Sequence, residues 1–271
     1  MIIGKRNFEI GKKTYIMGIL NVTPDSFSDG GKYENVDAAV EAAKRMIEEG
    51  ADIIDVGGES TRPGFTTISD EEEIKRIVPV IEGIKKECDI PVSADTYKFE
   101  VAKKALESGA DMINDIWGLK KDIRIAELVA KHDAVLCIAS NGEEISEKEG
   151  EEFCEYLLQD LAESAKKAID LGVSKDKIIL DPGVGFGKVF EQNLDVLKHA
   201  EMFARAQYPV LFAISRKSVI GLSTGFAVDE RDEATIATTV LAAKAGIDFV
   251  RVHNVDANAK ALKMTEIILR G

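Results

Sequence analysis

Short apolar runs recur along this chain, and nearly every run ends in polar or charged residues. The run at residues 209–214, for example, is followed at once by Ser215, Arg216 and Lys217. The other runs are followed by Asn21, residues 57–62, Asp95, Asn114 with Asp115, Asp181, and Arg251 with His253. Polar side chains at the carboxyl end of each strand are typical of a (β/α)8 barrel, which builds its active site there. The pattern therefore predicts an α/β fold of the TIM-barrel type, with a functional site at the strand ends.

Helical stretches alternate with the apolar runs. We expect eight main helices, at residues 36–49, 70–87, 98–108, 122–132, 151–171, 190–200, 229–245 and 256–270. Several end at a glycine, which can adopt the left-handed conformation beyond a helix, namely Gly50, Gly109, Gly172 and Gly246. An open doubly wound sheet is the nearest rival fold. Its glycine-rich phosphate turn is missing after the first strand, where residues 21–25 read Asn-Val-Thr-Pro-Asp.

The N-terminus and the length of the chain complete the predicted architecture. Apolar residues flank a turn within the first ten residues, which predicts an N-terminal β-hairpin that closes the bottom of the barrel. No linker or low-complexity segment divides the chain, and 271 residues are an ordinary length for one barrel. We therefore expect residues 1–271 to form a single domain.

Charge and composition narrow the class of partner. The formal net charge of -13 repels polyanions, so nucleic acids and anionic membranes are not expected as partners. The chain has no apolar stretch of about eighteen residues that could span a membrane, and its first residues do not read as a secretion signal. Cys88, Cys137 and Cys154 lack the spacing of a metal site and fit reduced thiols. We expect a cytoplasmic enzyme that acts on small molecules.

Two predicted loops suggest the chemistry. The loop at residues 21–33 is long and polar, as in a lid that closes over a reactive intermediate. The loop at residues 57–64 combines Arg62 with two hydroxyls and flexible glycines, which suits an anion. Further polar motifs follow later strands, at residues 95–98, 114–115, 181–188, 215–218 and 251–253. Together the motifs closely resemble those of the dihydropteroate synthases, a family of pterin-binding barrels, over residues 17–255.

The resemblance implies a transferase of folate biosynthesis. Such an enzyme condenses (7,8-dihydropterin-6-yl)methyl diphosphate with 4-aminobenzoate to give 7,8-dihydropteroate and diphosphate. The family's pterin contacts match Asp95, Asn114, Ile138, Asp181, Phe186, Lys217 and Arg251. Its diphosphate contacts match Asn21, Thr61, Arg62, Arg251 and His253. Its 4-aminobenzoate contacts match Arg62, Pro63, Phe186, Ser215 and Lys217.

Further expectations come with the same resemblance. It implies Mg²⁺ held by the diphosphate and the amide oxygen of Asn21, and catalytic roles for Asn21, Asp95, Lys217 and Arg251. It also implies a homodimer and access for sulfonamides as mimics of 4-aminobenzoate. Oligomeric state rests on the resemblance alone, because the apolar stripes of the outer helices serve core packing equally well.

The matched residue types suit this chemistry. A pterin ring carries donors and acceptors along its edges, so buried carboxylates and amides can pair with it. The planar guanidinium of Arg251 can stack on the ring face. Departure of diphosphate needs neutralised charge rather than a covalent step. We expect C–O cleavage to precede attack, with the Asp95 carboxylate stabilising a pterin cation and no general base required for the amine.

Three stretches depart from the family pattern. Residues 139–143, beginning at Ala139, replace a Met-His-Met-type stretch and a Gly-x-Pro turn, and Ile138 stands where a methionine wall is expected. Asn254 stands where aspartate is common, and residues 233–239 contain threonines in place of small residues. Two alternatives therefore stay open. A methyltetrahydrofolate-dependent corrinoid methyltransferase would hold a pterin but would not need residues 61–63 or 215–217, and a pterin-binding protein could lack synthase activity.

Overall fold

Parallel strands form the centre of the molecule. The computed structural model describes residues 1–23, 32–59, 66–141 and 147–270. In this part of the chain, eight strands form one parallel sheet in the order β8-β7-β6-β5-β4-β3-β10-β9. A parallel bridge between Leu180 and Val210 joins the two edges, so the sheet curves into a nearly closed barrel. The strands are β3 (Tyr15–Asn21), β4 (Ile53–Gly57), β5 (Val92–Asp95), β6 (Met112–Asp115), β7 (Val135–Ala139), β8 (Ile178–Asp181), β9 (Leu211–Phe212) and β10 (Phe249–Val252).

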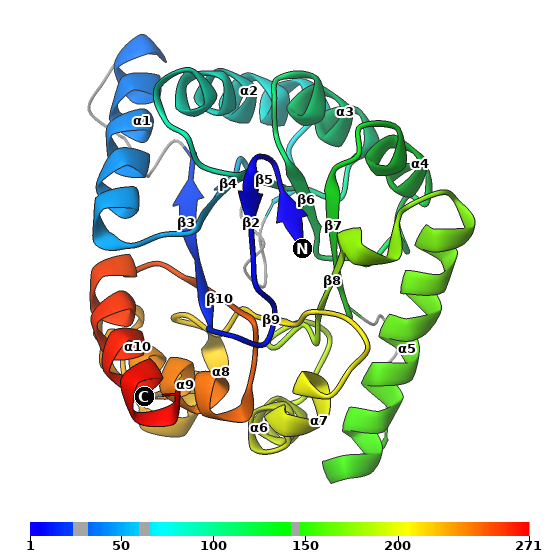
Figure 1. The fold of residues 1–271 in the computed structure, drawn as a ribbon, viewed down its shortest axis with the longest axis vertical. Helices are drawn as coiled ribbons and strands as arrows, with labels where there is room; N and C mark the ends of the chain where they lie inside the picture. Colours follow the sequence, from blue (N-terminus) through cyan, green and yellow to red (C-terminus); the bar gives the residue numbers. More distant parts are fainter. Residues whose placement is uncertain (24–31, 60–65, 142–146, 271) are drawn as a thin grey trace.

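Helices surround the barrel, as Figure 1 shows, and the predicted TIM barrel is confirmed. The helices of the described residues are α1 (Lys32–Glu49), α2 (Asp70–Glu87), α3 (Phe99–Glu107), α4 (Arg124–Lys131), α5 (Gly150–Asp170), α6 (Phe190–Lys198), α7 (Ala200–Ala204), α8 (Ser218–Thr224), α9 (Asp232–Ala245) and α10 (Val255–Arg270). Short 3-10 turns lie at Lys175–Lys177 and Val228–Glu230. Helices α7 and α8 were not predicted, because five and seven residues are too few to show a helical period. No helix among the described residues combines the length and apolar character needed to cross a membrane.

The N-terminal hairpin closes the bottom of the barrel, as predicted. Strand β1 (Ile2–Ile3) pairs antiparallel with β2 (Arg6–Asn7), and Figure 1 shows both within the ring of helices. The Phe8 ring that follows packs against Tyr15 and Phe249, with ring centroids 4.8 Å and 5.8 Å apart. These aromatic side chains fill the barrel interior at its amino end. The opposite end, where the strands finish, remains available for polar side chains.

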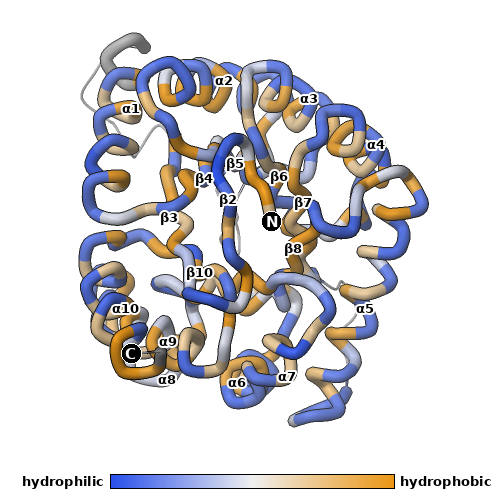
Figure 2. Tube along the Cα trace, viewed as in Figure 1, coloured by the Kyte–Doolittle hydropathy of each residue, from blue (hydrophilic) through white to orange (hydrophobic). Residues whose placement is uncertain are grey.

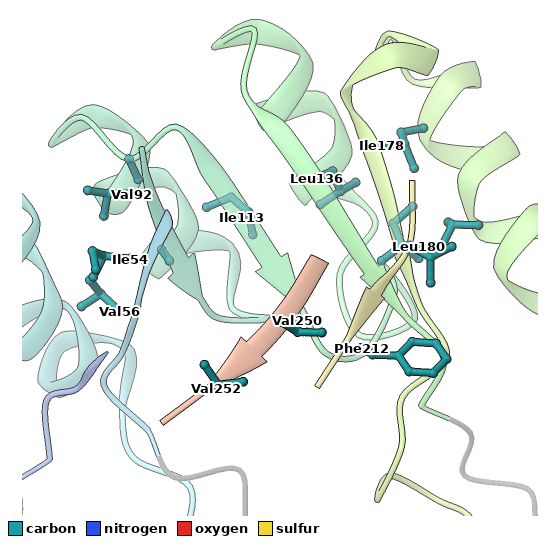
Figure 3. Close-up of a cluster of buried hydrophobic side chains, with 14 of the residues drawn as sticks. Ile54, Val56, Val92, Ile113, Leu136, Ile178, Leu180, Phe212, Val250 and Val252 are labelled. Carbon is teal, nitrogen blue, oxygen red and sulfur yellow. The ribbon is translucent and has the colours of Figure 1, made fainter. Parts of the chain in front are cut away.

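Two apolar layers decide which side of each strand faces inward. The inner layer fills the barrel and includes Met17, Ile53 and Met112. The outer layer, drawn in part in Figure 3, lies between the strands and the helices and includes Ile54 and Val56. Along the helices, Figure 2 shows hydrophobic segments alternating with hydrophilic ones, as packing on one face requires. Because side chains alternate along a strand, the residues between the outer-layer positions point into the barrel.

Candidate functional site

Buried polar side chains gather inside the barrel near the strand ends. Asp95 on β5 lies in register with Gly57 of β4 on one side and Asn114 of β6 on the other. Asp181 ends β8 and is buried as well. Asp55, which lies between the outer-layer residues of β4, is fully buried and faces inward. Parallel strands all finish at one rim of a barrel, and this arrangement therefore brings carboxylates and an amide from four strands together.

Arg251 joins two of these carboxylates. Its Nε donates to Asp55 Oδ2 and its Nη2 to Asp95 Oδ2, both at 2.6 Å. Burial raises the pKa of Asp95 to about 7, and the charges of Asp55 and Glu73 act in the same direction, against the attraction of Arg251. Burial opposes the charge on Arg251 too, but Asp55 and Asp95 outweigh it and raise the pKa of the guanidinium. The three groups form one ion-paired unit in which the carboxylates outnumber the cation.

Three acceptor oxygens in or beside this ion-paired unit have no hydrogen bond within the described residues. They are buried and lie on the neighbouring strands β4, β5 and β6, and they are Asp55 Oδ1, Asp95 Oδ1 and Asn114 Oδ1. A buried polar atom without a partner costs about 1–3 kcal/mol. Three carbonyl-type oxygens in one place therefore indicate a site for a ligand that presents several N–H donors.

The loop after β8 brings a cation to the same rim. The Asp181 carboxylate accepts a hydrogen bond from Gly183 N at 2.8 Å, which turns the chain away from the strand. Lys217 donates to the carbonyl of Val184, and its Nζ lies 4.2 Å from the centre of the Phe186 ring. Burial lowers the pKa of Lys217 to about 8, although Asp181 opposes the shift. This lysine can therefore carry or release a proton near neutral pH.

Lys188 ties this loop to the end of β7. Its Nζ donates to the carbonyls of Ser140, Gly183 and Phe186 at 2.8, 3.0 and 3.0 Å. The Ser140 hydroxyl donates to Asp160 on α5 at 2.7 Å. Burial lowers the pKa of Lys188 to about 7, with Asp181 opposing. The atypical stretch that begins at Ala139 therefore keeps a defined contact with the loop after β8.

Ser215 and His253 form a second polar pair at the rim. The Ser215 hydroxyl lies 3.0 Å from His253 Nδ1 and accepts from the His253 backbone N–H at 3.2 Å. Arg216, which follows Ser215 in the chain, does not join this pair. Its guanidinium pairs with Asp232 at 2.6 and 2.8 Å instead. Asn254 donates to the same Asp232 carboxylate at 3.0 Å. An aspartate at position 254 would meet Asp232 as a like charge, so the asparagine fits its surroundings here.

Asn21, at the end of β3, is the residue to test for a metal. Its Oδ1 lies 3.6 Å from the point that a Cβ on Gly57 would occupy, and Asp95 borders the same point at 3.6 Å. In the described residues, no group of three or more His, Cys, Asp or Glu side chains could hold a metal ion. A single amide oxygen suits Mg²⁺, which keeps its waters and binds phosphate oxygens readily. The residues therefore fit Mg²⁺ that arrives with a phosphate-bearing ligand.

Most of the predicted site residues within the described ranges meet at this rim. They are Asn21, Asp95, Asn114, Asp181, Phe186, Ser215, Lys217, Arg251 and His253. Ile138 is not among them, because β7 directs this side chain into the outer layer, between the barrel and the helices. Cys137 belongs to the inner layer instead. Thr61, Arg62 and Pro63, as well as most of the predicted lid at residues 21–33, lie outside the described residues.

Sequence reasoning missed Asp55 and Lys188. Asp55 interrupts an apolar strand two residues before its end, and that interruption was the available signal, because a charge in a buried strand needs a partner. Lys188 follows three glycines spaced two apart, which have φ angles of 70°, 86° and 58°. A lysine after such a loop shows no periodicity that would reveal its acceptors, since all three are backbone carbonyls.

Comparisons with known proteins agree with this geometry. A family described as pterin binding enzymes matches residues 17–253. The dihydropteroate synthase of Clostridium beijerinckii is 54% identical to this chain over 271 residues, covering 100% of both sequences. The chain belongs to the dihydropteroate synthase family. The predicted family and its enzyme class, a transferase, are thereby confirmed.

Solved structures of this family share the fold throughout. A crystal structure of dihydropteroate synthase from Clostridium difficile, in the presence of pteroic acid, is 50% identical with a TM-score of 0.93, covering 98% of this chain and 100% of that chain. The enzyme of Xanthomonas albilineans with 4-aminobenzoic acid is 37% identical with a TM-score of 0.89, covering 95% and 94%. The barrel described here is thus the fold of the dihydropteroate synthase family.

Proposed function

We propose that this chain condenses (7,8-dihydropterin-6-yl)methyl diphosphate with 4-aminobenzoate, forming 7,8-dihydropteroate and diphosphate. One observation carries the proposal beyond family membership. Two buried oxygens on adjacent strands, Asp95 Oδ1 and Asn114 Oδ1, have no hydrogen-bond donor among the described residues. The amide, amine and ring N–H groups along the edges of a dihydropterin would supply such donors. An apolar ligand would leave these oxygens unpaired at a cost of about 1–3 kcal/mol each.

The pterin ring would lie between the acceptors and the cations. Asp95, Asn114 and Asp181 would accept from its N–H groups, and Lys217 would donate to its carbonyl edge. Arg251 would lie against the ring face, because a guanidinium held flat by two carboxylates can stack on a π-system. Phe186, which already packs on Lys217, would cover the other apolar edge.

The diphosphate would lie at the rim. We assign its contacts to Asn21, Thr61, Arg62, Arg251 and His253, where Thr61 and Arg62 follow from the family resemblance alone. Mg²⁺, bound by the diphosphate and Asn21 Oδ1, would supply positive charge to the leaving oxygen. The side chains listed here orient the diphosphate and offset its charge, which is the main requirement for its departure.

Bond cleavage would precede attack. The C–O bond to the exocyclic methylene breaks, the diphosphate leaves with the electron pair, and the dihydropterin becomes a cation. In its ionised form the Asp95 carboxylate, which pairs with Arg251, stabilises that cation. The amine of 4-aminobenzoate then forms the C–N bond and loses a proton to solvent.

The 4-aminobenzoate would bind beside the loop after β8. Ser215 and Lys217 would contact its ring and carboxylate, and Phe186 would form an apolar wall. Arg62 and Pro63 complete the proposed subsite from the resemblance. Sulfonamides have the same aromatic amine and an acidic group at the far end, so they would occupy this subsite as mimics.

We also propose that the enzyme is a cytoplasmic homodimer. Exposed apolar side chains on α9 and α10 support the dimer, since Leu241, Met264, Ile267 and Ile268 are each more than half exposed. Figure 2 shows the hydrophobic end of α10 near the C-terminus. The free thiols of Cys88, Cys137 and Cys154 support the cytoplasmic location, because thiols stay reduced in that compartment.

One assay tests the reaction. Purified protein is given the dihydropterin methyl diphosphate and Mg²⁺ with and without 4-aminobenzoate, and diphosphate and dihydropteroate are followed in parallel. Dihydropteroate that forms only with both substrates would establish the synthase. Tight pterin binding without product would identify a binding protein, and methyl transfer from methyltetrahydrofolate to a corrinoid would identify a methyltransferase.

A further inference from the structure

Asp55 is the most deeply buried charged group of the site. Its residue exposure is 0%, and it lies in β4 between two side chains of the outer apolar layer. An ionised carboxylate in such a place is costly unless cations and donors compensate it. Among the described residues Asp55 has two hydrogen-bond partners, Arg251 and Asn114, and both donate to the single oxygen Oδ2. Its position is therefore explained by what it does to these two side chains.

Asp55 determines the orientation of the Arg251 guanidinium. Asp55 accepts from Nε on one side of the group, and Asp95 accepts from Nη2, each at 2.6 Å. Two anchors on one planar group fix both its position and its plane, whereas Asp95 alone would leave it free to pivot. Within the described residues Nη1 has no acceptor, so this corner of the guanidinium stays available to a ligand.

Asp55 also determines which end of the Asn114 amide faces the site. Asn114 Nδ2 donates to Asp55 Oδ2 at 3.4 Å, and a carboxylate can accept but not donate. The NH2 group must therefore turn toward Asp55. The opposite end, Oδ1, is buried without a partner and faces the position of the ligand as an acceptor. With a neutral group at position 55, the Asn114 amide would lose the carboxylate that holds its NH2 group away from the ligand.

We propose that Asp55 is a positioning residue of the pterin site, which holds Arg251 and Asn114 in the orientations that a pterin ring requires. The proposal rests on the function proposed above, because it assumes that this site receives a pterin. Asp55 acts through its two neighbours. Its charge also raises the pKa of Asp95, after the larger effect of burial, so it influences the carboxylate that faces the ligand.

Binding of pteroic acid tests the proposal directly. Asp55→Ala removes both hydrogen bonds and should weaken pteroic acid binding by about 10- to 100-fold, as expected when binding groups lose their orientation. Asp55→Asn keeps the shape and one acceptor oxygen, so it should recover part of this loss. If Asp55 merely filled space, Asp55→Asn would bind like the wild type, and that result would overturn the proposal.

Ser93→Ala is the matched control. Ser93 pairs in register with Asp55 on the adjacent strand, is also fully buried, and its hydroxyl has no hydrogen bond in the described part of the chain. Its loss should change pteroic acid binding by less than about twofold. Thermal unfolding of all variants is measured alongside. The Michaelis constant for 4-aminobenzoate should stay near the wild-type value in Asp55→Asn, because Ser215 and Phe186 do not contact Asp55.

A double-mutant cycle shows whether Asp55 acts through Arg251. In an Arg251→Met background the guanidinium is absent, so Asp55→Asn should lower pteroic acid affinity by a smaller factor than in the wild-type background, and the remaining effect is the part that acts through Asn114. Full additivity of the two substitutions would overturn the proposal. A wild-type protein that binds pteroic acid but forms no dihydropteroate would overturn the reaction proposed above. The Asp55 series would still decide this inference, because it depends on binding alone.

Discussion

Gly183→Ala offers the sharpest test of the loop after β8. Gly183 has a φ angle of 70°, and a Cβ at this position would lie 2.1 Å from the Ser140 carbonyl oxygen and 3.2 Å from Lys188 Nζ. The Ser140 oxygen is backbone, and it already accepts a hydrogen bond from Lys188. The alanine side chain could therefore be accommodated only if the end of β7 and the loop move apart.

The expected loss of stability has two parts. An alanine in the left-handed region costs roughly 1–2 kcal/mol relative to glycine. Relief of the contact requires a shift of backbone that costs about 1–3 kcal/mol, as for an overpacked core. A total near 3 kcal/mol would lower the midpoint of thermal unfolding by about 6–12 °C in a chain of this size. Displacement of Phe186 should also lower kcat/KM for 4-aminobenzoate by about tenfold.

Gly225→Ala is the control for backbone strain. Gly225 follows α8 with a φ angle of 77°, and no atom of the described residues lies within 4 Å of the point that its Cβ would occupy. It should therefore show only the first part of the loss, about 1–2 kcal/mol, which lowers the midpoint by about 2–8 °C. Thermal unfolding followed by circular dichroism measures both variants. Equal shifts for Gly183→Ala and Gly225→Ala would refute the argument that Ser140 restricts the loop.

Further predictions concern catalysis and assembly. The kcat/KM for the pterin substrate should fall as the pH drops through about 7, because protonation of Asp95 removes the charge that stabilises the cation. Asp95→Asn should abolish that fall, and a fall that persists would belong to another group. Asp95→Ala should lower turnover far more than it weakens diphosphate binding, and equal losses would contradict its role as cation stabiliser. EDTA should stop product formation and added Mg²⁺ should restore it, while full activity in EDTA would exclude the role given to Asn21. Ile268→Asp places a charge on an exposed apolar face and should convert the dimer to a monomer in sedimentation experiments; a dimer that persists would place the interface elsewhere.

The order of strands and helices could be read from the sequence. Helix α2, for example, was predicted at its observed bounds of 70 and 87, and in the structure the Ser69 side chain caps its first turn. Helix α8 was missed, since seven residues that include Gly221 show no such period. The split between α6 and α7 at His199 was missed for the same reason, because the second helix has only five residues.

Within the site, the register of the strands decides which side chains point into the barrel, and the motifs alone do not predict this. The motif residues Asp95, Asn114, Asp181 and Arg251 were found because they follow apolar runs and match a known family. The inward or outward direction of a side chain depends on the alternation within each strand, and a shift by one residue reverses it. This is why Ile138 was assigned to the pocket but packs against the helices. Asp55 was missed because its partner Arg251 lies 196 residues away in the chain.

The sequence by itself determined the barrel, the family and the residue types at the strand ends, because these depend on local periodicity and on short motifs. The tertiary structure alone decided which of these side chains meet. It showed that Arg251 lies between Asp55 and Asp95, and that Lys188 ties the loop after β8 to Ser140. Such contacts join strands far apart in the chain, and their distances depend on how the whole sheet closes rather than on any local pattern of residues.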